Sequence, residues 1–452
     1  MDIKYLKIRD IDIFSMIFSG LLYLGLGIIF LTQKNILMFA VRGLLNLLVI
    51  LFAIIAMFQL IGFTPLRKKR LTAISRLFGF VANLVMALII YFSPEEVVSV
   101  LPIAFGIYAF FSGIVRFLIY LQYRKNKVPR RIFILVGAIV LTFFGIMIVT
   151  KPLAYLVPLS NLIGTFFIFY GFTFLMDGLL EGLPLETKNS FKRRFRISLP
   201  VFMVALIPHK ILMEINKAFE TEELSQKDLV YFKENTPCDL EVFIHVAEKG
   251  TYAFGHVDIW FEGKIMTYGC YDESTFKLGG LISDGVLVEI EDKEKYIAFS
   301  QSHLGKTLFG FGLKLTKEQK IRVREKIEEI HENLYEWKPK SRIDEEMGIR
   351  PEKPYKDYSS ILYENLKGKF YKFMKGPFKT YFAMNTNCVL LADTIVGQAG
   401  IDLVKIQGLI SPGAYFEYFN REFLRKNSFV VSRTIYYDLE GQKKKKSLGR
   451  KW

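Results

Sequence analysis

Six apolar segments in the first 180 residues constrain the fold of this 452-residue chain more than any other feature. They cover residues 13–31, 43–63, 77–92, 97–119, 132–149 and 153–175. A helix needs about 20 apolar residues to cross the hydrocarbon core of a bilayer, so we expect the third and fifth segments to extend into their flanks. The pattern predicts a multi-pass α-helical membrane bundle over residues 1–185.

The apolar segments also repeat in pairs. The first members align on Gly20, Gly79 and Gly137, and the second members on Gly43, Gly106 and Gly164, with Gly113 and Gly171 seven residues after the last two. Small residues on one helix stripe let backbones approach closely in a membrane, so the repeat predicts three helical hairpins. This period and glycine placement over residues 13–180 resemble the HdeD-like family of bacterial membrane proteins, some of which are linked to acid resistance by name.

The distribution of positive charge predicts the orientation of the spans. Thirteen lysines and arginines lie in the N-terminal segment and in the connections 64–76 and 124–131, whereas the opposite side has Lys34, Arg42 and Lys151. Short cytoplasmic connections are enriched in Lys and Arg, so we expect a cell-membrane protein with both termini in the cytoplasm. The net charge of +16 is thereby explained by topology, and we expect no nucleic-acid partner.

Most of the charge lies after residue 186, although 51% of the whole chain is hydrophobic. This contrast excludes a single soluble globule and predicts a linker over 186–234, an α+β domain over 235–436 and a basic tail over 437–452 that we expect to lie against anionic lipid. The segment 197–208, ISLPVFMVALIP, is too short to cross a membrane and is expected to form a buried strand or an interfacial segment.

Strands and helices of the α+β domain can be predicted from their patterns. EVFIHVA and HVDIWF alternate as half-buried strands do, and EGK is a tight turn that leads into IMTYGCY. Thr316 and Gln319 form a capping box at the start of a long amphipathic helix. Residues 338–358 are polar and contain prolines, so we expect a loop there, one that could act as a lid.

Cys388 is the residue best placed by the sequence for chemistry. It follows Asn385, Thr386 and Asn387, each able to cap a helix that begins at the cysteine. The positive end of the helix dipole favours the thiolate, and a cysteine nucleophile needs that form and a base. His256 follows a glycine and opens a strand, so it is the candidate base. The residues alone leave open that the two are structural and share no role.

The other chemical motifs are expected to be inert. Cys238 and Cys270 have neither CxxC spacing nor a nearby histidine pair, so we expect structural thiols and no metal. GKT at Gly305 lacks the upstream glycine of a nucleotide-binding loop. We therefore expect no cofactor.

GHVDIWFEGKIMTYGCYD followed downstream by YFAMNTNCVLLADTIVGQAGID resembles the permuted papain-like (NlpC-type) superfamily. In that superfamily a histidine opening a strand precedes an Asn-Cys that opens a helix. The resemblance covers residues 235–405 and implies Cys388 as nucleophile and His256 as base. Tyr268 has the spacing of the third polar residue, which usually comes from the next strand; Asp258 and Asn387 are other polar groups nearby.

Three functions follow as hypotheses. The resemblance implies a membrane-anchored cysteine hydrolase or acyltransferase that acts on an amide or ester, with a membrane peptide or lipid-linked molecule as substrate. The alternative is a non-catalytic, stress-related membrane protein whose soluble domain binds a partner. A transporter with a regulatory domain would need a polar path, and no span has paired charges at its centre.

Overall fold

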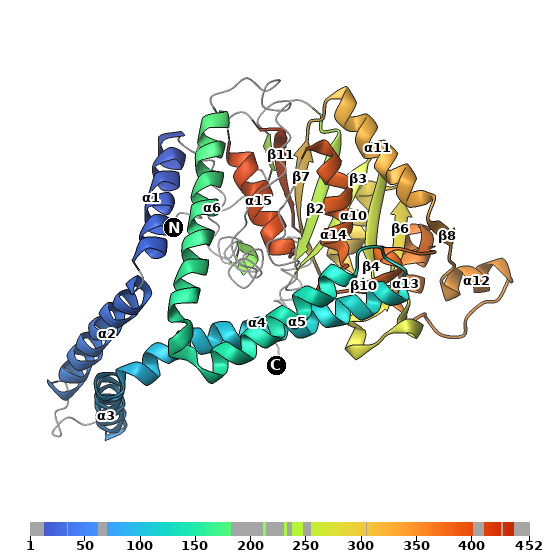
Figure 1. Ribbon diagram of the computed structural model, residues 1–452. Helices are drawn as coiled ribbons and strands as arrows, with labels where there is room; N and C mark the ends of the chain where they lie inside the picture. The colour runs from blue at the N-terminus through green and yellow to red at the C-terminus, as the bar shows by residue number, and fades with distance from the viewer. Residues whose placement is uncertain are drawn as a thin grey trace. The chain divides into compact units, whose positions relative to one another are not determined.

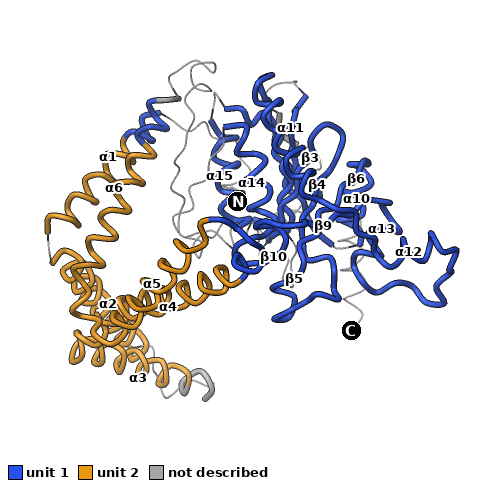
Figure 2. The backbone as a smooth tube through the Cα atoms, turned by 45° about the vertical axis from the view of Figure 1, so that its right-hand side comes forward, with its two compact units in different colours: residues 1–17, 122–129, 175–452 blue, residues 18–121, 130–174 orange. Residues whose placement is uncertain are grey.

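The computed structural model describes residues 13–33, 35–61, 70–181, 211–213, 230–232, 237–246, 255–303, 305–400, 411–425 and 428–437. The chain forms two compact units, shown in Figure 2. Unit 1 comprises residues 1–17, 122–129 and 175–452, and unit 2 comprises residues 18–121 and 130–174. The boundaries expected at residues 185, 235 and 436 stay predictions. The segment 197–208 and the tail from residue 438 lie outside the described residues.

Six helices within the described residues are long and apolar enough to cross a membrane. They are α1 (Ile13–Thr32), α2 (Ile36–Ile61), α3 (Arg70–Phe92), α4 (Pro94–Lys125), α5 (Ile132–Thr150) and α6 (Leu156–Glu181), the last preceded by the short helix η1 (Pro152–Tyr155). α3 extends into its N-terminal flank as expected, whereas α5 exceeds its predicted segment by one residue. The chain is thus a multi-pass membrane protein.

Several of the glycines that recur in the sequence repeats lie at close helix contacts between repeats. A Cβ added to Gly113 of α4 would lie 2.7 Å from the backbone nitrogen of Thr142 in α5, and one added to Gly106 would lie 3.0 Å from the Gly145 oxygen. Similarly, a Cβ on Gly164 of α6 would lie 3.0 Å from the Gly27 oxygen in α1. α4 therefore packs on α5, and α6 on α1, with backbones nearly in contact.

The remaining repeat interface, α2 with α3, is built differently. Gly43 has no atom within 4 Å of an added Cβ, and Gly79 faces the side chain of Gln59. The Gln59 Oε1 atom accepts a hydrogen bond from Asn83 Nδ2 at 3.2 Å, so a polar side-chain pair joins these two helices. A hydrogen bond between spans contributes about 1 kcal/mol in a membrane.

We predict that Gly113→Ala destabilises the membrane domain and that Gly43→Ala does not. The added methyl group at position 113 meets the backbone of α5, where overpacking costs about 1–3 kcal/mol, whereas position 43 has open space. Both variants gain the same helix propensity, so each is the control of the other. The measurement is the unfolding temperature of the detergent-solubilised full chain. Equal temperatures for the two variants would contradict the close α4–α5 contact.

A nine-stranded antiparallel sheet organises unit 1, with strand order β1-β11-β7-β2-β3-β4-β6-β9-β8. The strands are β1 (Val230–Phe232), β2 (Leu240–Val246), β3 (His256–Phe261), β4 (Lys264–Gly269), β6 (Val286–Ile290), β7 (Thr307–Leu313), β8 (Leu334–Glu336), β9 (Lys369–Phe373) and β11 (Val430–Tyr436); β5 (Ile282–Asp284) and β10 (Thr380–Phe382) form a separate pair. The α+β class is confirmed, and β2, β3 and β4 lie where the alternation predicts them.

Helices cover both faces of the sheet (Figure 1). One face packs on α11 (Lys317–His331), α14 (Cys388–Val396) and α15 (Pro412–Leu424), through inward side chains such as Val242, Ile259 and Tyr268. The other face packs on α10 (Lys293–Ser302) and α13 (Tyr358–Leu366). Since successive strand residues point to opposite faces, neighbours along one strand belong to different cores.

Local signals explain two further helices. The capping box predicted at Thr316 and Gln319 is present and starts α11. The side chain of each residue accepts a hydrogen bond from the backbone N–H of the other. The loop expected over 338–358 is wrong in part, because α12 (Lys340–Glu346) forms directly after Pro339. A proline just before a helix is compatible with it, since its missing N–H would have no partner there.

Candidate active site

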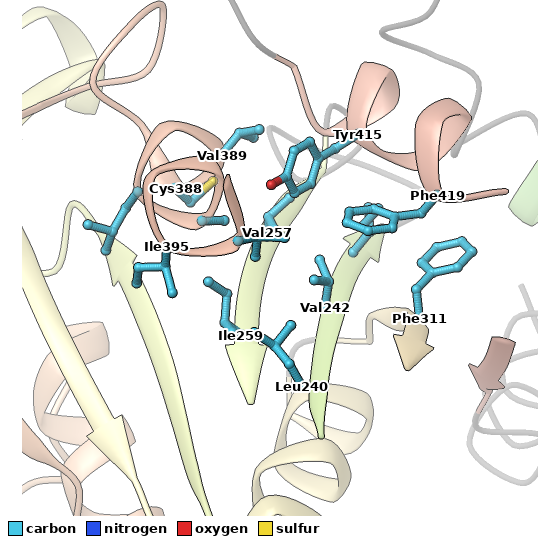
Figure 3. Packing of buried hydrophobic residues seen from close by; sticks show 14 of the residues in the cluster. Leu240, Val242, Val257, Ile259, Phe311, Cys388, Val389, Ile395, Tyr415 and Phe419 are labelled. Carbon is cyan, nitrogen blue, oxygen red and sulfur yellow. The ribbon is translucent and has the colours of Figure 1, made fainter. Parts of the chain in front are cut away.

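Cys388 is the first residue of α14, as the sequence predicts. The Oδ1 atom of Asn387 accepts a hydrogen bond from the Leu390 N–H at 3.1 Å, which caps the helix and stabilises it by about 1 kcal/mol. Its Nδ2 atom donates to the Ala383 oxygen at 3.0 Å and so fixes the preceding loop. Cys388 is 4% exposed and lies among the apolar residues of Figure 3, with Val257 and Val389 labelled beside it.

The structure brings His256 and Cys388 together. His256 opens β3, and its ring makes a side-chain hydrogen bond with the Cys388 thiol. Its Nε2 atom lies 2.9 Å from Asp258 Oδ1 and 3.0 Å from Thr267 Oγ1. Because Nε2 faces these two oxygens, Nδ1 is the ring nitrogen left for the sulfur. The arrangement is a thiol, an imidazole and a carboxylate in series.

Asp258 is a fully buried carboxylate between two histidines. Its Oδ2 atom lies 2.7 Å from Nε2 of His245 and accepts a hydrogen bond from the hydroxyl group of Tyr296. His245 lies on β2 opposite His256, so the neighbouring strand brings the second imidazole to the carboxylate. A buried carboxylate needs such partners, since transferring an unpaired charge from water into a protein core is prohibitive.

The ionisation of these three groups follows from their surroundings. Burial favours the neutral form of His245 and lowers its pKa to about 4, although Asp258 opposes this. Burial also disfavours charge on His256, but Asp258 and Cys388 outweigh it and raise its pKa to about 10. The two histidines in turn hold the pKa of Asp258 well below its usual range despite burial. At neutral pH His256 is therefore the cation paired with the Asp258 carboxylate.

Tyr268 does not contact His256 within this structure. Its hydroxyl group donates to the Phe378 oxygen at 2.8 Å, and its ring packs against Phe373 and Phe378. Thr267 lies opposite Asp258 in the β3–β4 register, and Tyr268, one residue later, points to the other face of the sheet. The residue that β4 brings to His256 is Thr267, whose Oγ1 also lies 2.6 Å from the Tyr271 hydroxyl.

Two further groups near the cysteine were not found by sequence reasoning. Tyr381 makes a side-chain hydrogen bond with Cys388, and burial together with Cys388 raises the pKa of Tyr381 well above its usual value. Lys306 is 5% exposed, and burial lowers its pKa to about 8 although the charges of Asp258 and Cys388 oppose this. Tyr381 precedes the cysteine by seven residues, whereas no sequence signal connects Lys306 with it.

The remaining histidines and cysteines lie elsewhere. His303 stacks on Phe299 at the end of α10, and His331 Nε2 lies 2.6 Å from Glu289 Oε1; His209 is outside the described residues. Cys238 and Cys270 are half-buried free thiols, and burial raises the pKa of both. No group of three or more His, Cys, Asp or Glu residues within the described parts of the chain is placed to hold a metal ion.

Unit 1 also includes residues 122–129, which contact the loop before Cys388. Gln122 Nε2 donates to Thr386 Oγ1 at 2.7 Å and to the Thr380 oxygen at 2.8 Å. Asn126 Nδ2 donates to Thr380 Oγ1 at 3.0 Å. The loop that carries the Asn387 cap is therefore held on one side by these two amide side chains.

Comparison with known proteins identifies only part of the membrane domain. Residues 81–150 match the family described as "Short repeat of unknown function (DUF308)". This match and the six apolar helices fit a membrane domain of the HdeD type. No curated protein and no solved structure matches the chain.

We predict that His256 makes the stability of the protein depend on pH between about 6.5 and 10. In this window the folded protein keeps the His256 proton, whereas the unfolded chain, with a pKa near 6.5, loses it. The stabilisation is fully present below pH 6.5 and is lost as the pH rises through about 10. Unfolding temperatures of the full chain at pH 6, 8 and 10 should therefore fall more steeply than those of His256→Gln.

The control for this measurement is His303→Gln, because His303 is exposed and has no contact with Asp258. It should keep the pH dependence of the unsubstituted protein. Equal slopes for the unsubstituted protein and His256→Gln would show that His256 is not a buried cation in the folded state.

Proposed function

We propose that the protein is a membrane-anchored cysteine hydrolase or acyltransferase of the permuted papain-like type, acting on an amide or ester. The observation that carries this proposal is the contact of Cys388, at a helix N-terminus, with a buried His256 that Asp258 orients. A helix N-terminus and a cationic imidazole both stabilise a thiolate, which is the nucleophilic form of cysteine. In this proposal Asp258 takes the orienting role for which Tyr268 was predicted.

The chemistry assigned to these groups has two steps. The Cys388 sulfur forms a bond with the substrate carbonyl carbon, and collapse of the oxyanion breaks the bond to the leaving alcohol or amine, which takes a proton from His256. Water or another nucleophile then attacks the acyl-thioester and gives its proton to His256, and the Cys388 thiolate leaves. The Cys388 N–H and the Tyr381 hydroxyl are the candidate donors to the oxyanion.

Asp258 and His245 would act through His256. A carboxylate on Nε2 fixes the ring orientation and stabilises the imidazolium, as the acid does in other nucleophile–His–acid sites. The neutral His245 and the Tyr296 hydroxyl occupy the other carboxylate oxygen. These contacts hold the Asp258 carboxylate between the two histidines.

One observation favours the non-catalytic alternative, in which the soluble domain binds a partner. Cys388 is 4% exposed, so a substrate carbonyl reaches the sulfur only if neighbouring side chains move. Measuring the reactivity of the Cys388 thiol distinguishes the enzymatic function from the partner-binding one, because a structural cysteine in an apolar core is inert.

We predict that iodoacetamide alkylates Cys388 faster than Cys238 and Cys270 at pH 6–7 in the folded full chain. Exposure alone predicts the opposite order, since the other two thiols are less buried. His256→Ala and Asp258→Asn should slow the reaction of Cys388 at least about tenfold, because the first removes the imidazolium beside the sulfur and the second removes the carboxylate that keeps this ring charged. Peptide mapping by mass spectrometry gives the rate for each cysteine.

His303→Ala is the control substitution and should leave all three rates unchanged. Cys388→Ser should remove any esterase activity toward p-nitrophenyl acetate while keeping the unfolding temperature, because the two side chains are similar in volume. Equal and slow labelling of the three cysteines would overturn the enzymatic proposal and support the partner-binding one.

The proposed location of the site is the cytoplasmic face of the cell membrane. The basis is the excess of lysine and arginine in the connections 62–69 and 126–131, compared with the short connections 33–35 and 151 on the other side. An even number of spans places both ends of the membrane domain on one side. Peptidoglycan, a substrate of many NlpC-type enzymes, would then be out of reach.

We predict that alkaline phosphatase fused to the C-terminus is inactive and that a fluorescent protein fused there is bright. Placing the charged connection 67–70 in the bilayer would cost about 3 kcal/mol per charge, so the loop fixes a membrane boundary. The matched control is a phosphatase inserted after Lys151, in a connection assigned to the opposite side, which should be active. Phosphatase activity at the C-terminus would instead place the soluble domain outside and make a cell-wall substrate accessible.

A further inference from the structure

The loop between β4 and β5 exposes large apolar side chains on one surface of unit 1. Phe276 is 42% exposed, Leu278 63% and Leu281 47%, and Met384, on the loop before Cys388, is 43% exposed. They are neighbours: a Cβ on Gly280 would lie 3.6 Å from the Phe276 ring, and the Leu281 oxygen accepts from the Ala383 N–H at 3.0 Å. We name Phe276, Leu278, Leu281 and Met384 the apolar patch.

The apolar patch is held by a defined backbone. Lys277 and Ile282 form an antiparallel bridge, with the Lys277 N–H donating to the Ile282 oxygen at 2.8 Å. Gly279 and Gly280 have φ values of +66° and +87°, which glycine adopts without strain, and they close the loop between these two residues. The β5–β10 pair, labelled side by side in Figure 2, joins this loop to the segment before Cys388. The fold thus presents these apolar side chains to the surroundings.

Two exposed lysines belong to the segments that carry the apolar patch. Lys277 and Lys379 are exposed and have no ion-pair partner among the described residues. Of the nearby acidic groups, Asp272 and Asp284 both pair with Lys372, at 2.6 and 3.0 Å, and Glu273 accepts a hydrogen bond from the Tyr358 N–H. Surfaces that enter the headgroup region of anionic membranes combine apolar side chains with exposed lysines.

Within unit 1, the segment before Cys388 contacts residues that continue directly into a helix of membrane-spanning length. Gln122 donates hydrogen bonds to the backbone oxygen of Thr380, the first residue of β10, and to the hydroxyl group of Thr386 in the loop before Cys388. All three residues belong to unit 1. Gln122 lies in the last turn of α4, a helix long and apolar enough to cross a membrane. Within unit 1, the segment that carries Met384 therefore lies beside the last turn of α4.

We propose that the apolar patch inserts into the boundary between headgroups and acyl chains of the anionic bilayer that holds the six helices. Leu278 and Phe276 enter the apolar region, and Lys277 and Lys379 contact lipid phosphates. In this arrangement Met384, on the loop before Cys388, contacts lipid. This inference is independent of whether Cys388 is catalytic, because none of the observations behind it involves the Cys388 thiol.

The test uses the full chain in nanodiscs that contain phosphatidylcholine and phosphatidylglycerol. The three native cysteines are replaced by serine, and Leu278→Cys is labelled with the fluorophore NBD. A lipid with a nitroxide near the start of its acyl chain should quench this label about threefold or more relative to a label at Met347→Cys. Met347 is the matched control, since it is 68% exposed and lies at the end of α12, away from the apolar patch.

A second pair of measurements tests the charge contribution. Lys277→Gln combined with Lys379→Gln, and separately nanodiscs of phosphatidylcholine alone, should each lower the quenching at position 278 by about half or more. A label at Leu281→Cys repeats the measurement in case the first variant alters the loop, and unfolding temperatures verify that each labelled chain is folded.

Equal quenching at positions 278 and 347, or none at 278 and 281, would overturn the proposal. A blue-shifted emission at position 278 that nitroxide lipid does not quench would also overturn it, and would assign the apolar patch to contact with protein. Neither result depends on Cys388 chemistry, so the failure of this inference is distinguishable from failure of the proposed function.

Discussion

The soluble site depends on the burial of one carboxylate, Asp258. An ionised carboxylate is expensive to remove from water, and here it is stabilised by His256, His245 and the hydroxyl group of Tyr296. The carboxylate keeps His256 charged, and the charged ring faces Cys388. Removing Asp258 would take away the acceptor of His245 and the counter-charge of His256, so the network stabilises the fold and orients the candidate base at the same time.

Strand alternation explains how a helix on one face of the sheet meets a histidine on the other. Val257 and Ile259 point to the core beneath α14, whereas His256 and Asp258 belong to the opposite face. The two sets can meet only where β3 begins, because the sheet ends there. Gly255, with φ of +91°, turns the chain into β3 at this point, and a Cβ on it would lie 2.7 Å from Pro412. A histidine later in the strand would be separated from Cys388 by the sheet itself.

Much of this site could be predicted from local patterns. The Asn-Cys helix start, the capping box of α11 and the strand opened by His256 depend on neighbouring residues, and each was found. Tyr268, the predicted third polar residue, directly follows Thr267, which is the residue of β4 that contacts His256. The tight turn at residues 262–263 pairs Phe261 with Lys264 and therefore Asp258 with Thr267, so the register was available from the turn itself. By contrast, His245 comes from β2 and Lys306 directly precedes β7, and no local pattern predicts that these distant segments meet at the site.

In the membrane domain, too, local sequence patterns did not predict which elements pack together. The sequence repeat pairs α1 with α2, α3 with α4 and α5 with α6, but the close interfaces are α2–α3, α4–α5 and α6–α1. Each joins the second helix of one repeat to the first helix of the next, and α6–α1 closes the cycle. Glycines at Gly106 and Gly164 allow backbone contact in two of these interfaces, while Gln59 and Asn83 hydrogen-bond in the other. Similar sequence repeats therefore do not need the same contacts. Where Gly43 has no neighbour, the hydrogen bond between Gln59 and Asn83 takes the place of close glycine packing. Both kinds of contact can hold helices together in lipid, where no hydrophobic driving force acts between them.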